Sequence, residues 1–395
     1  MLYSATDSQG RNHTHPQWRG NSFALPLAGL LPPLHAQWEA NMLAAGAQWG
    51  DYLTAFFPAQ GTYQEATYTY YDSQRVFYNI AEYTGNAPLW EAYALEGERV
   101  YLNYTLYSIN DFYGYDFSFP GYRRFSHGFL GHWARDPLAH GTEYLIKIRD
   151  NPAYSNPDTA GKANEWYWVR YSREVAYALS AHVNAEKAGL ARNNARLPLY
   201  VAMALSHVNE WVTGQRGNPD EGYNRFAPFM AGLTSEALIE YYEWEAAQGN
   251  TPDNTIPNAL QSLADFVWSS TVVGGSAVGL PMWVPDVGGT GFPHNDTGGS
   301  GVGGFRYEDR LNTESPGDLT TRVDPDLGLL LAPLYAWLYM RTGDVGYIDK
   351  GDLIWEGCVA LASVDWNTKI FNQSYRWSFD YMKWRNQGLA SGGHV

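Results

Sequence analysis

The feature that most constrains the fold of this chain is a helical hairpin that recurs along it. An aromatic-rich segment with helical periodicity ends at a glycine-containing turn, and a second helical segment follows. The four clearest copies span residues 75–108, 173–214, 233–270 and 327–363. Their turn glycines, Gly85, Gly189, Gly249 and Gly343, stand where a helix end needs a residue with positive φ. Repeated helical hairpins predict a solenoid or a closed toroid.

Three more helices fit residues 37–56, 137–149 and 368–385, which brings the total to about a dozen helices, or about six hairpins. Strand signal is sparse, and only "TVVGGSAVGLPMWV" could form a small hairpin. We therefore predict an all-α protein, an (α/α) toroid or barrel in a single domain over 1–395. An N-terminal extension (1–33) and a long glycine-rich loop (273–324) complete it.

The lengths of the connections indicate which rim of such a toroid carries function. Turns within hairpins are short, whereas the connections between hairpins, about 108–125, 150–165, 214–227 and 273–324, are long. These long loops would emerge on one rim, beside the N-termini of the first helix of each pair, which favour anions. Seven arginines lie on or next to them: Arg123, Arg124, Arg170, Arg225, Arg306, Arg310 and Arg322. The pattern predicts a rim that binds an anionic ligand.

Composition excludes several classes of partner. The formal net charge of −15 disfavours nucleic acid and anionic membrane surfaces as partners. No apolar run approaches the roughly 18 residues that span a bilayer. One cysteine, Cys358, excludes an internal disulfide and a cysteine-based zinc cluster. His294, Asn295 and Asp296 form "HND" in the glycine-rich loop, a triplet that is more often solvated than metal-binding, and we predict neither a metal site nor a cofactor.

The segment "VRYSREVAYALSAHV" (169–183) carries a polar stripe on a predicted helix. Arg170, Arg173, Glu174 and Tyr177 stand at i, i+3, i+4 and i+7, which is one helix face. The stripe could be a solvated outer face with an ordinary ion pair, or it could face the lumen of the toroid. The asymmetry of the loops favours the lumen.

Two chemistries suit an arginine-lined, aromatic-rich toroid. A lyase that acts on a uronic acid needs a neutraliser for the substrate carboxylate, a base, and an acid for the leaving oxygen. Tyrosine can serve as base where neighbouring positive charge lowers its pKa. A glycoside hydrolase needs two carboxylates across the scissile bond. The candidate carboxylates are Glu65, Glu165, Glu174, Glu236, Asp324 and Asp326, which the sequence does not pair at a defined distance.

One arrangement resembles a known family. His127, in "GYRRFSHGFLGHW", begins one inner helix, and Arg170 and Tyr177 follow on the next. This spacing, over about 50 residues, is similar to that of the toroidal alginate and glucuronan lyases. The resemblance implies that Tyr177 transfers the proton and that His127 and Arg170 assist at the substrate carboxylate. Ser126 stands where some members have Asn, so Glu65, Glu174 and Glu236 are the local options for the neutraliser.

We therefore predict a polysaccharide lyase that cleaves an alginate-like, uronate-containing polymer by β-elimination outside the cytoplasm. Residues 1–18 do not resemble a signal peptide. A signal peptide could have been cleaved from the protein. Arg306 and Tyr307 are an alternative acid/base pair. The alternatives of a glycoside hydrolase and a non-catalytic glycan-binding toroid stay open, as does the oligomeric state. Expected substrate contacts are Arg173, Trp166, Trp168, Tyr171, Glu65, Glu236, Arg306, Tyr307, Tyr375 and Arg376.

Overall fold

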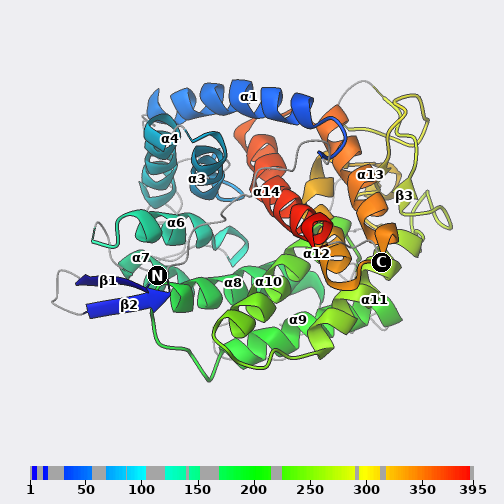
Figure 1. Cartoon of the computed structure of the whole chain (residues 1–395). Coiled ribbons are helices and arrows are strands. Elements are labelled where there is room, and N and C mark those ends of the chain that lie inside the picture. The colour runs from blue at the N-terminus through cyan, green and yellow to red at the C-terminus, as the bar shows by residue number, and fades with distance from the viewer. Residues whose placement is uncertain are drawn as a thin grey trace.

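The computed structural model describes residues 2–6, 12–16, 31–55, 68–85, 87–103, 121–138, 142–151, 169–214, 225–289, 293–311 and 317–391. This part of the chain is predominantly helical, which confirms the all-α prediction (Figure 1). Its α-helices are α1 (His35–Ala55), α3 (Ser73–Thr84), α4 (Ala87–Val100), α6 (His127–Arg135), α7 (Glu143–Arg149), α8 (Ser172–Lys187), α9 (Leu197–Thr213), α10 (Pro228–Ala247), α11 (Thr255–Ser269), α12 (Ala332–Thr342), α13 (Val345–Leu361) and α14 (Thr368–Ala390).

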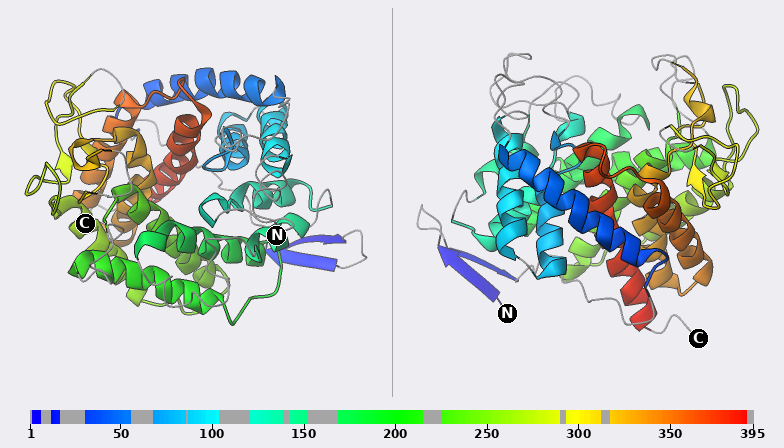
Figure 2. Two further views of the ribbon diagram at one scale, coloured as in Figure 1. Left: turned by 180° about the vertical axis from the view of Figure 1, so that it is seen from behind. Right: turned by 90° about the horizontal axis from the view of Figure 1, so that it is seen from above.

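Six helices contact one another in a closed order. Helix α3 contacts α6, α6 contacts α8, α8 contacts α10, α10 contacts α12, α12 contacts α14, and α14 returns to α3. We call these six the inner helices. The other helices lie against their outer sides: α4 packs on α3, α7 and α9 on α8, α11 on α10, and α13 on α12, while α1 bridges α4 and α14 (Figures 1 and 2).

The turn chemistry explains where several helices begin and end. All four predicted turn glycines have positive φ, from 67° at Gly85 to 87° at Gly189. Asn367 caps α14 by accepting a hydrogen bond of 2.9 Å from the backbone N–H of Ile370. The predicted helix at 137–149 is shorter in the structure, because Pro137 and Leu138 form a turn and α7 begins at Glu143.

Strands are few among the described residues, and the predicted hairpin at 271–284 forms as a short antiparallel bridge with backbone hydrogen bonds on either side of it. The segment 271–284 has a bridge between Thr271 and Pro281, whereas β3 (Trp283–Val284) pairs with β4 (Gly304–Phe305). Within the predicted N-terminal extension, β1 (Leu2–Thr6) pairs antiparallel with β2 (Asn12–Pro16). Three 3-10 turns bear on the site: η4 (Val169–Tyr171), η5 (Leu319–Thr321) and η6 (Pro325–Leu330).

The core is packed with aromatic side chains and closely approaching backbones. Five tryptophans are essentially fully buried: Trp38, Trp211, Trp337, Trp355 and Trp377. Gly232 of α10 lies so close to η6 that a Cβ there would be 2.4 Å from the carbonyl oxygen of Leu330. The tight crossing of α10 and η6 therefore depends on glycine. Among the described helices, none is both long and apolar enough to cross a membrane.

Side-chain contacts place the two ends of the inner helices. At their N-terminal ends, the Tyr70 ring before α3 lies 5.6 Å from the Phe125 ring before α6, and the Lys369 ammonium of α14 lies 5.7 Å from the Tyr70 ring. Toward the other end, a cavity is lined by the C-terminal parts of α8 and α14, by α3, α6 and α10, and by Pro333 of α12. The described part of the connection 273–324 reaches the N-terminal end, where the Tyr307 ring lies 5.4 Å from the ring of Phe229 at the start of α10.

Candidate functional site

Helix α8 carries the predicted polar stripe, and the stripe is buried. Glu174 and Tyr177 are 4% and 2% exposed, while Val175 and Leu179 on the other side of α8 are 0% exposed. Both sides of α8 therefore pack against other elements. The alternative in which the stripe forms a solvated outer face is wrong.

Arg173 connects the stripe to the N-terminal ends of the other inner helices. One of its guanidinium nitrogens donates to the Tyr70 hydroxyl at 3.4 Å, and another donates to the Glu174 carboxylate at 3.0 Å. The Tyr122 ring lies 4.9 Å from the same guanidinium. Arg170, in η4, instead donates to the Tyr171 hydroxyl and stacks on that ring at 4.5 Å. The cations that act on Tyr177 are thus Arg376, whose guanidinium lies 5.7 Å from its ring, and Arg173, and not the predicted Arg170.

Tyr177 is more deeply enclosed than a proton-transferring residue should be. Its hydroxyl is buried and has no hydrogen-bond partner. Burial raises the pKa of Tyr177 well above its usual value, and Tyr70 adds to this effect, although Arg376 and Arg173 oppose it. The expected lowering by positive charge is therefore outweighed by desolvation.

Tyr307 lies at the same end and is partly exposed. The Arg322 guanidinium lies 4.9 Å from its ring centroid. The pKa of Tyr307 is raised, chiefly by burial and also by Asp324, although Arg225, Arg322 and Arg173 oppose the shift by stabilising the phenolate. A tyrosine hydroxyl within the field of three guanidiniums suits both an anionic ligand and proton transfer.

The side chains of Arg306 and Tyr307 point in different directions, because successive residues of an extended segment alternate. The Arg306 side chain is 3% exposed and donates to the carbonyl oxygens of Pro281 and Thr320 at 3.0 and 3.2 Å, and to Asp296 at 2.7 Å. It holds the 281–320 region together. The predicted pair of Arg306 and Tyr307 is therefore separated, and Arg306 is not placed to touch a substrate.

Two buried carboxyls lie at the start of η6: Asp324, which precedes η6 and lines a small pocket with Tyr307, and Asp326, which lies within η6. Arg322 binds both oxygens of Asp324, one of them at 2.5 Å, and Gln373 donates to Asp326 at 2.6 Å. Burial raises the pKa of Asp324 to about 6, and the charge of Asp326 adds to the shift, which outweighs the lowering by Arg322. Asp324 can therefore exist as an acid near neutral pH. We call Tyr307, Arg173, Arg225, Arg322 and Asp324 the N-terminal cluster.

His127 lies deeper in the molecule, toward the opposite end of the inner helices. Its Nε2 is 2.6 Å from Glu240, whose other carboxylate oxygen accepts from Ser180 at 2.9 Å. Its Nδ1 is 3.5 Å from an Arg376 guanidinium nitrogen. A guanidinium can only donate, so Nδ1 accepts from Arg376 and Nε2 donates to Glu240. Both ring nitrogens are engaged, so His127 holds α6, α10 and α14 together and offers no free base.

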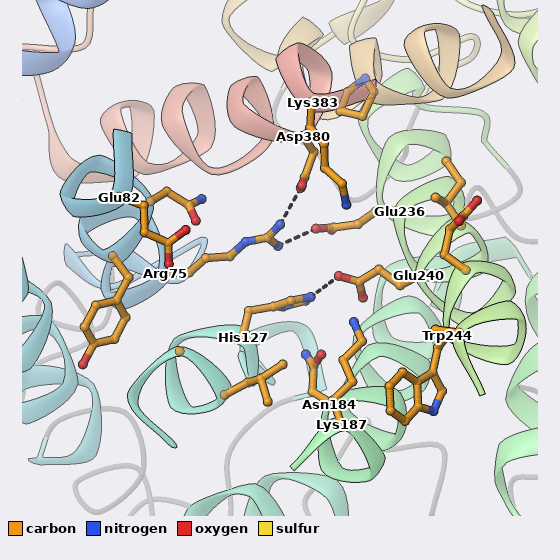
Figure 3. Close-up of a pocket in the computed structure, with 18 of the residues that line it drawn as sticks. Arg75, Glu82, His127, Asn184, Lys187, Glu236, Glu240, Trp244, Asp380 and Lys383 are labelled. Carbon is orange, nitrogen blue, oxygen red and sulfur yellow. Dashed lines mark hydrogen bonds and ion pairs between the residues drawn. The ribbon is translucent and has the colours of Figure 1, made fainter. Parts of the chain in front are cut away.

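Glu236 anchors a buried ion-pair network around His127. Arg75 donates to Glu236 at 2.6 Å and also pairs with Asp380, and Arg376 donates to the other oxygen of Glu236 at 3.1 Å (Figure 3). The two guanidiniums keep the pKa of Glu236 below its usual value despite burial. The predicted residues His127, Glu236 and Arg376 therefore lie together, 109 or more residues apart in sequence.

A cavity of about 280 Å³ lies beside this network, at the C-terminal ends of the inner helices. Figure 3 shows Arg75 and His127 entering from one side, Glu236 and Glu240 from the other, and Lys187 and Lys383 extending toward the middle. Sequence reasoning missed Glu240 and both lysines. The signal for Glu240 was its position four residues after Glu236, on the same helix face.

The network contains a group that could be mistaken for a metal site. Ligand atoms of His127, Glu236 and Glu240 lie within 4.8 Å of one another. However, Arg75 and Arg376 occupy both oxygens of Glu236, and His127 and Ser180 occupy both oxygens of Glu240. A divalent cation would have to displace these partners beside two guanidiniums, so the residues do not fit a metal.

The remaining predicted residues fall into two groups. Tyr375 is 2% exposed and donates to the carbonyl oxygen of Trp38 at 3.1 Å, so it is a core residue and not a substrate contact. Glu65, Trp166 and Trp168, with the carboxylate candidate Glu165, lie outside the described residues. No family model, curated protein or solved structure matches this chain. The functional assignment therefore depends on the site itself.

Proposed function

We propose that this chain is a polysaccharide lyase that cleaves a uronate-containing, alginate-like polysaccharide by β-elimination. We further propose that its closed order of inner helices is an (α/α) toroid, with the N-terminal cluster as its active site. A polymer of this class lies outside the cytoplasm, so the proposal includes an extracellular or periplasmic location.

The observation that carries this proposal is the position of Tyr307 among Arg173, Arg225 and Arg322. Elimination requires positive charge at the substrate carboxylate, because that charge acidifies the adjacent C–H bond. It also requires a base within reach of that proton. Tyr307 is partly exposed, whereas the hydroxyl of Tyr177 is enclosed. The proton-transfer role therefore moves from the predicted Tyr177 to Tyr307.

The proposed reaction uses these groups in a single balanced step. The phenolate of Tyr307 removes the proton next to the substrate carboxylate, and the electron pair of the C–H bond becomes a carbon–carbon double bond as the glycosidic C–O bond breaks. The leaving oxygen takes a proton from Tyr307 or from Asp324, whose pKa is raised to about 6. Guanidiniums stabilise the charge that develops on the carboxylate.

A glycoside hydrolase is the second candidate, and one observation favours it. Asp324 and Asp326 are neighbouring buried carboxyls, and burial raises the pKa of both. A raised carboxyl pKa is typical of a general acid in hydrolysis. However, hydrolysis gives no role to the three guanidiniums that act on Tyr307, whereas elimination uses them at the substrate carboxylate.

The test is digestion of alginate, polyglucuronate and polygalacturonate, with ultraviolet absorbance and reducing ends measured together. Elimination creates a conjugated double bond that absorbs in the ultraviolet, and hydrolysis does not. We expect Tyr307→Phe to reduce the ultraviolet signal by about 10²–10⁴-fold. Tyr177→Phe and the matched control Tyr241→Phe should keep most of it. Reducing ends without ultraviolet absorbance would favour the hydrolase, and full activity in Tyr307→Phe would refute this site.

A further inference from the structure

The cavity beside the ion-pair network has no part in the proposed elimination, yet among the described residues it presents two ammonium groups without a carboxylate partner, one of which, Lys383, lies 4.0 Å from the centroid of the Trp384 ring. Lys187 is the last residue of α8, and Lys383 lies on α14. They extend toward the middle of the cavity from opposite sides of the ion-pair network (Figure 3). In the described part of the chain, neither ammonium makes a hydrogen bond or an ion pair. The cavity therefore has donors available for an anion.

The same cavity has buried acceptors that lack donors. Asn184 is 0% exposed, and its Nδ2 donates to the Ser126 hydroxyl at 2.9 Å, which leaves its Oδ1 without a partner. Glu82 accepts from Arg135 at 2.9 Å through one oxygen, and its other oxygen is buried without a partner. Buried polar atoms of this kind favour a ligand that donates hydrogen bonds.

The charged groups of the inner wall do not supply the missing partners. Glu236 and Glu240 are saturated by the network described above, and Arg75 holds Asp380. The lining carries four cations (Arg75, Arg135, Lys187 and Lys383) and five carboxylates (Glu82, Glu236, Glu240, Glu243 and Asp380). A bound anion would therefore be held by the two ammonium groups themselves and not by an excess of positive charge.

The size and walls of the cavity limit the ligand further. Its volume of about 280 Å³ corresponds to roughly nine water molecules in the liquid, which fits one sugar ring and not a polymer. Trp244 and Trp384 form part of the wall, and because the Lys383 ammonium lies over the Trp384 ring, Trp244 is the indole available to a sugar. The indole N–H of Trp244 donates to Glu186 at 2.9 Å, which fixes the orientation of this ring before a ligand arrives. Aromatic faces are suitable partners for the apolar face of a sugar.

We propose that this cavity is a binding site for a monosaccharide-sized sugar acid. Lys187 and Lys383 hold its carboxylate, and its hydroxyls donate to Asn184 and Glu82. A neutral sugar would leave both ammonium groups unpaired, and inorganic phosphate would leave most of the buried acceptors unpaired. The ligand class follows from the cavity alone, so the inference does not rest on the proposed elimination.

The helix ends at this cavity have an effect that must be weighed against the proposal. Helix C-termini carry partial negative charge, which stabilises the ammonium of Lys187 and opposes an anion. This charge is spread over the last turn of each helix, whereas each ammonium carries a full charge inside the cavity. Burial lowers the pKa of Lys187, and a ligand carboxylate would raise it again. The direct pairing therefore outweighs the helix ends.

The experiment is calorimetric titration of the full chain with D-glucuronate, D-glucose and inorganic phosphate. We expect saturable binding of glucuronate, at least about tenfold tighter than that of glucose or phosphate. Lys187→Met and Lys383→Met should each weaken binding by about tenfold or more. Lys147→Met is the matched control, because Lys147 pairs on the surface with Glu143 at 2.7 Å and should leave the affinity unchanged.

Several outcomes would overturn the inference. They are the absence of saturable glucuronate binding, equal affinity for glucose, or unchanged affinity in both lysine variants. Tyr307→Phe separates this site from the N-terminal cluster, because it should abolish elimination and keep glucuronate binding. Loss of binding in Tyr307→Phe would place the ligand in the N-terminal cluster and refute the cavity site. Asn184→Ala, which removes an acceptor without changing charge, supplies a second variant if a lysine variant fails to fold.

Discussion

Arg75 is the residue whose replacement tests the buried network most directly. Its guanidinium binds Glu236 at 2.6 Å and also binds Asp380, and the three side chains are 7%, 8% and 13% exposed. Arg75→Met would leave Glu236 with Arg376 but would leave Asp380 without a guanidinium. Removal of one partner from a buried ion pair costs about 3–5 kcal/mol, because the remaining charge stays desolvated. We expect a loss of unfolding free energy in this range at neutral pH.

The loss should depend on pH in a defined direction. Burial raises the pKa of Asp380 above its usual 3.8, and Arg75 is the strongest group that opposes this shift. Without Arg75 the folded-state pKa rises further, while the unfolded value stays the same. A carboxyl whose folded pKa is raised loses stability as pH increases from the unfolded pKa through the folded one. The penalty of Arg75→Met should therefore be smaller near pH 4 than near pH 7.

The measurement is urea unfolding followed by tryptophan fluorescence at both pH values. The control Lys147→Met breaks an exposed pair, with side chains 35% and 61% exposed, and should cost well under about 1 kcal/mol. The double variant Arg75→Met with Asp380→Leu removes the orphaned charge and should recover at least half of the loss. The reasoning fails if Arg75→Met changes the unfolding free energy by less than the control does, or if its penalty is the same at both pH values.

Three further predictions concern residues that hold the two sites in place. Gly232→Ala should cost about 1–3 kcal/mol in urea unfolding, because its Cβ would lie 2.4 Å from the Leu330 carbonyl oxygen. The raised folded-state pKa of Asp324 makes the free energy of unfolding fall as the pH increases from 3.8 to about 6. Asp324→Asn should remove this part of the fall in urea unfolding, and an unchanged pH profile contradicts the prediction. Chelators should leave the thermal midpoint unchanged, because arginines, His127 and Ser180 already occupy the carboxylates of Glu236 and Glu240; a chelator-induced drop would reveal a metal.

The helices were predictable because their signals are local. The aromatic periodicity, the glycines with positive φ and the Asn367 cap all act within a few residues of the helix end that they define. The length of α7 was mispredicted, because the periodic pattern included a turn at Pro137 and Leu138.

The partners of each site residue were not predictable, because they depend on tertiary contacts. Glu240 lies 113 residues from His127 in sequence and contacts its Nε2, while Arg376 contacts its Nδ1, so both imidazole nitrogens are engaged. Burial of Tyr177 reverses the expected direction of its pKa, and no local pattern reports burial on both sides of α8. The separation of Arg306 from Tyr307 could have been foreseen, since extended segments alternate their side chains.

The buried network also explains why the two ends of the inner helices can hold different sites. Arg376 is 0% exposed and lies between the Tyr177 ring, 5.7 Å from its guanidinium, and the pair of His127 and Glu236. A ligand could pass between the N-terminal cluster and the cavity only by breaking several of these buried pairs. Because removing one partner of a buried pair costs several kcal/mol, the paired layer acts as a wall between the two ends. A polymer at the N-terminal cluster therefore has to lie across that rim, and the cavity at the other end receives its ligand from its own side.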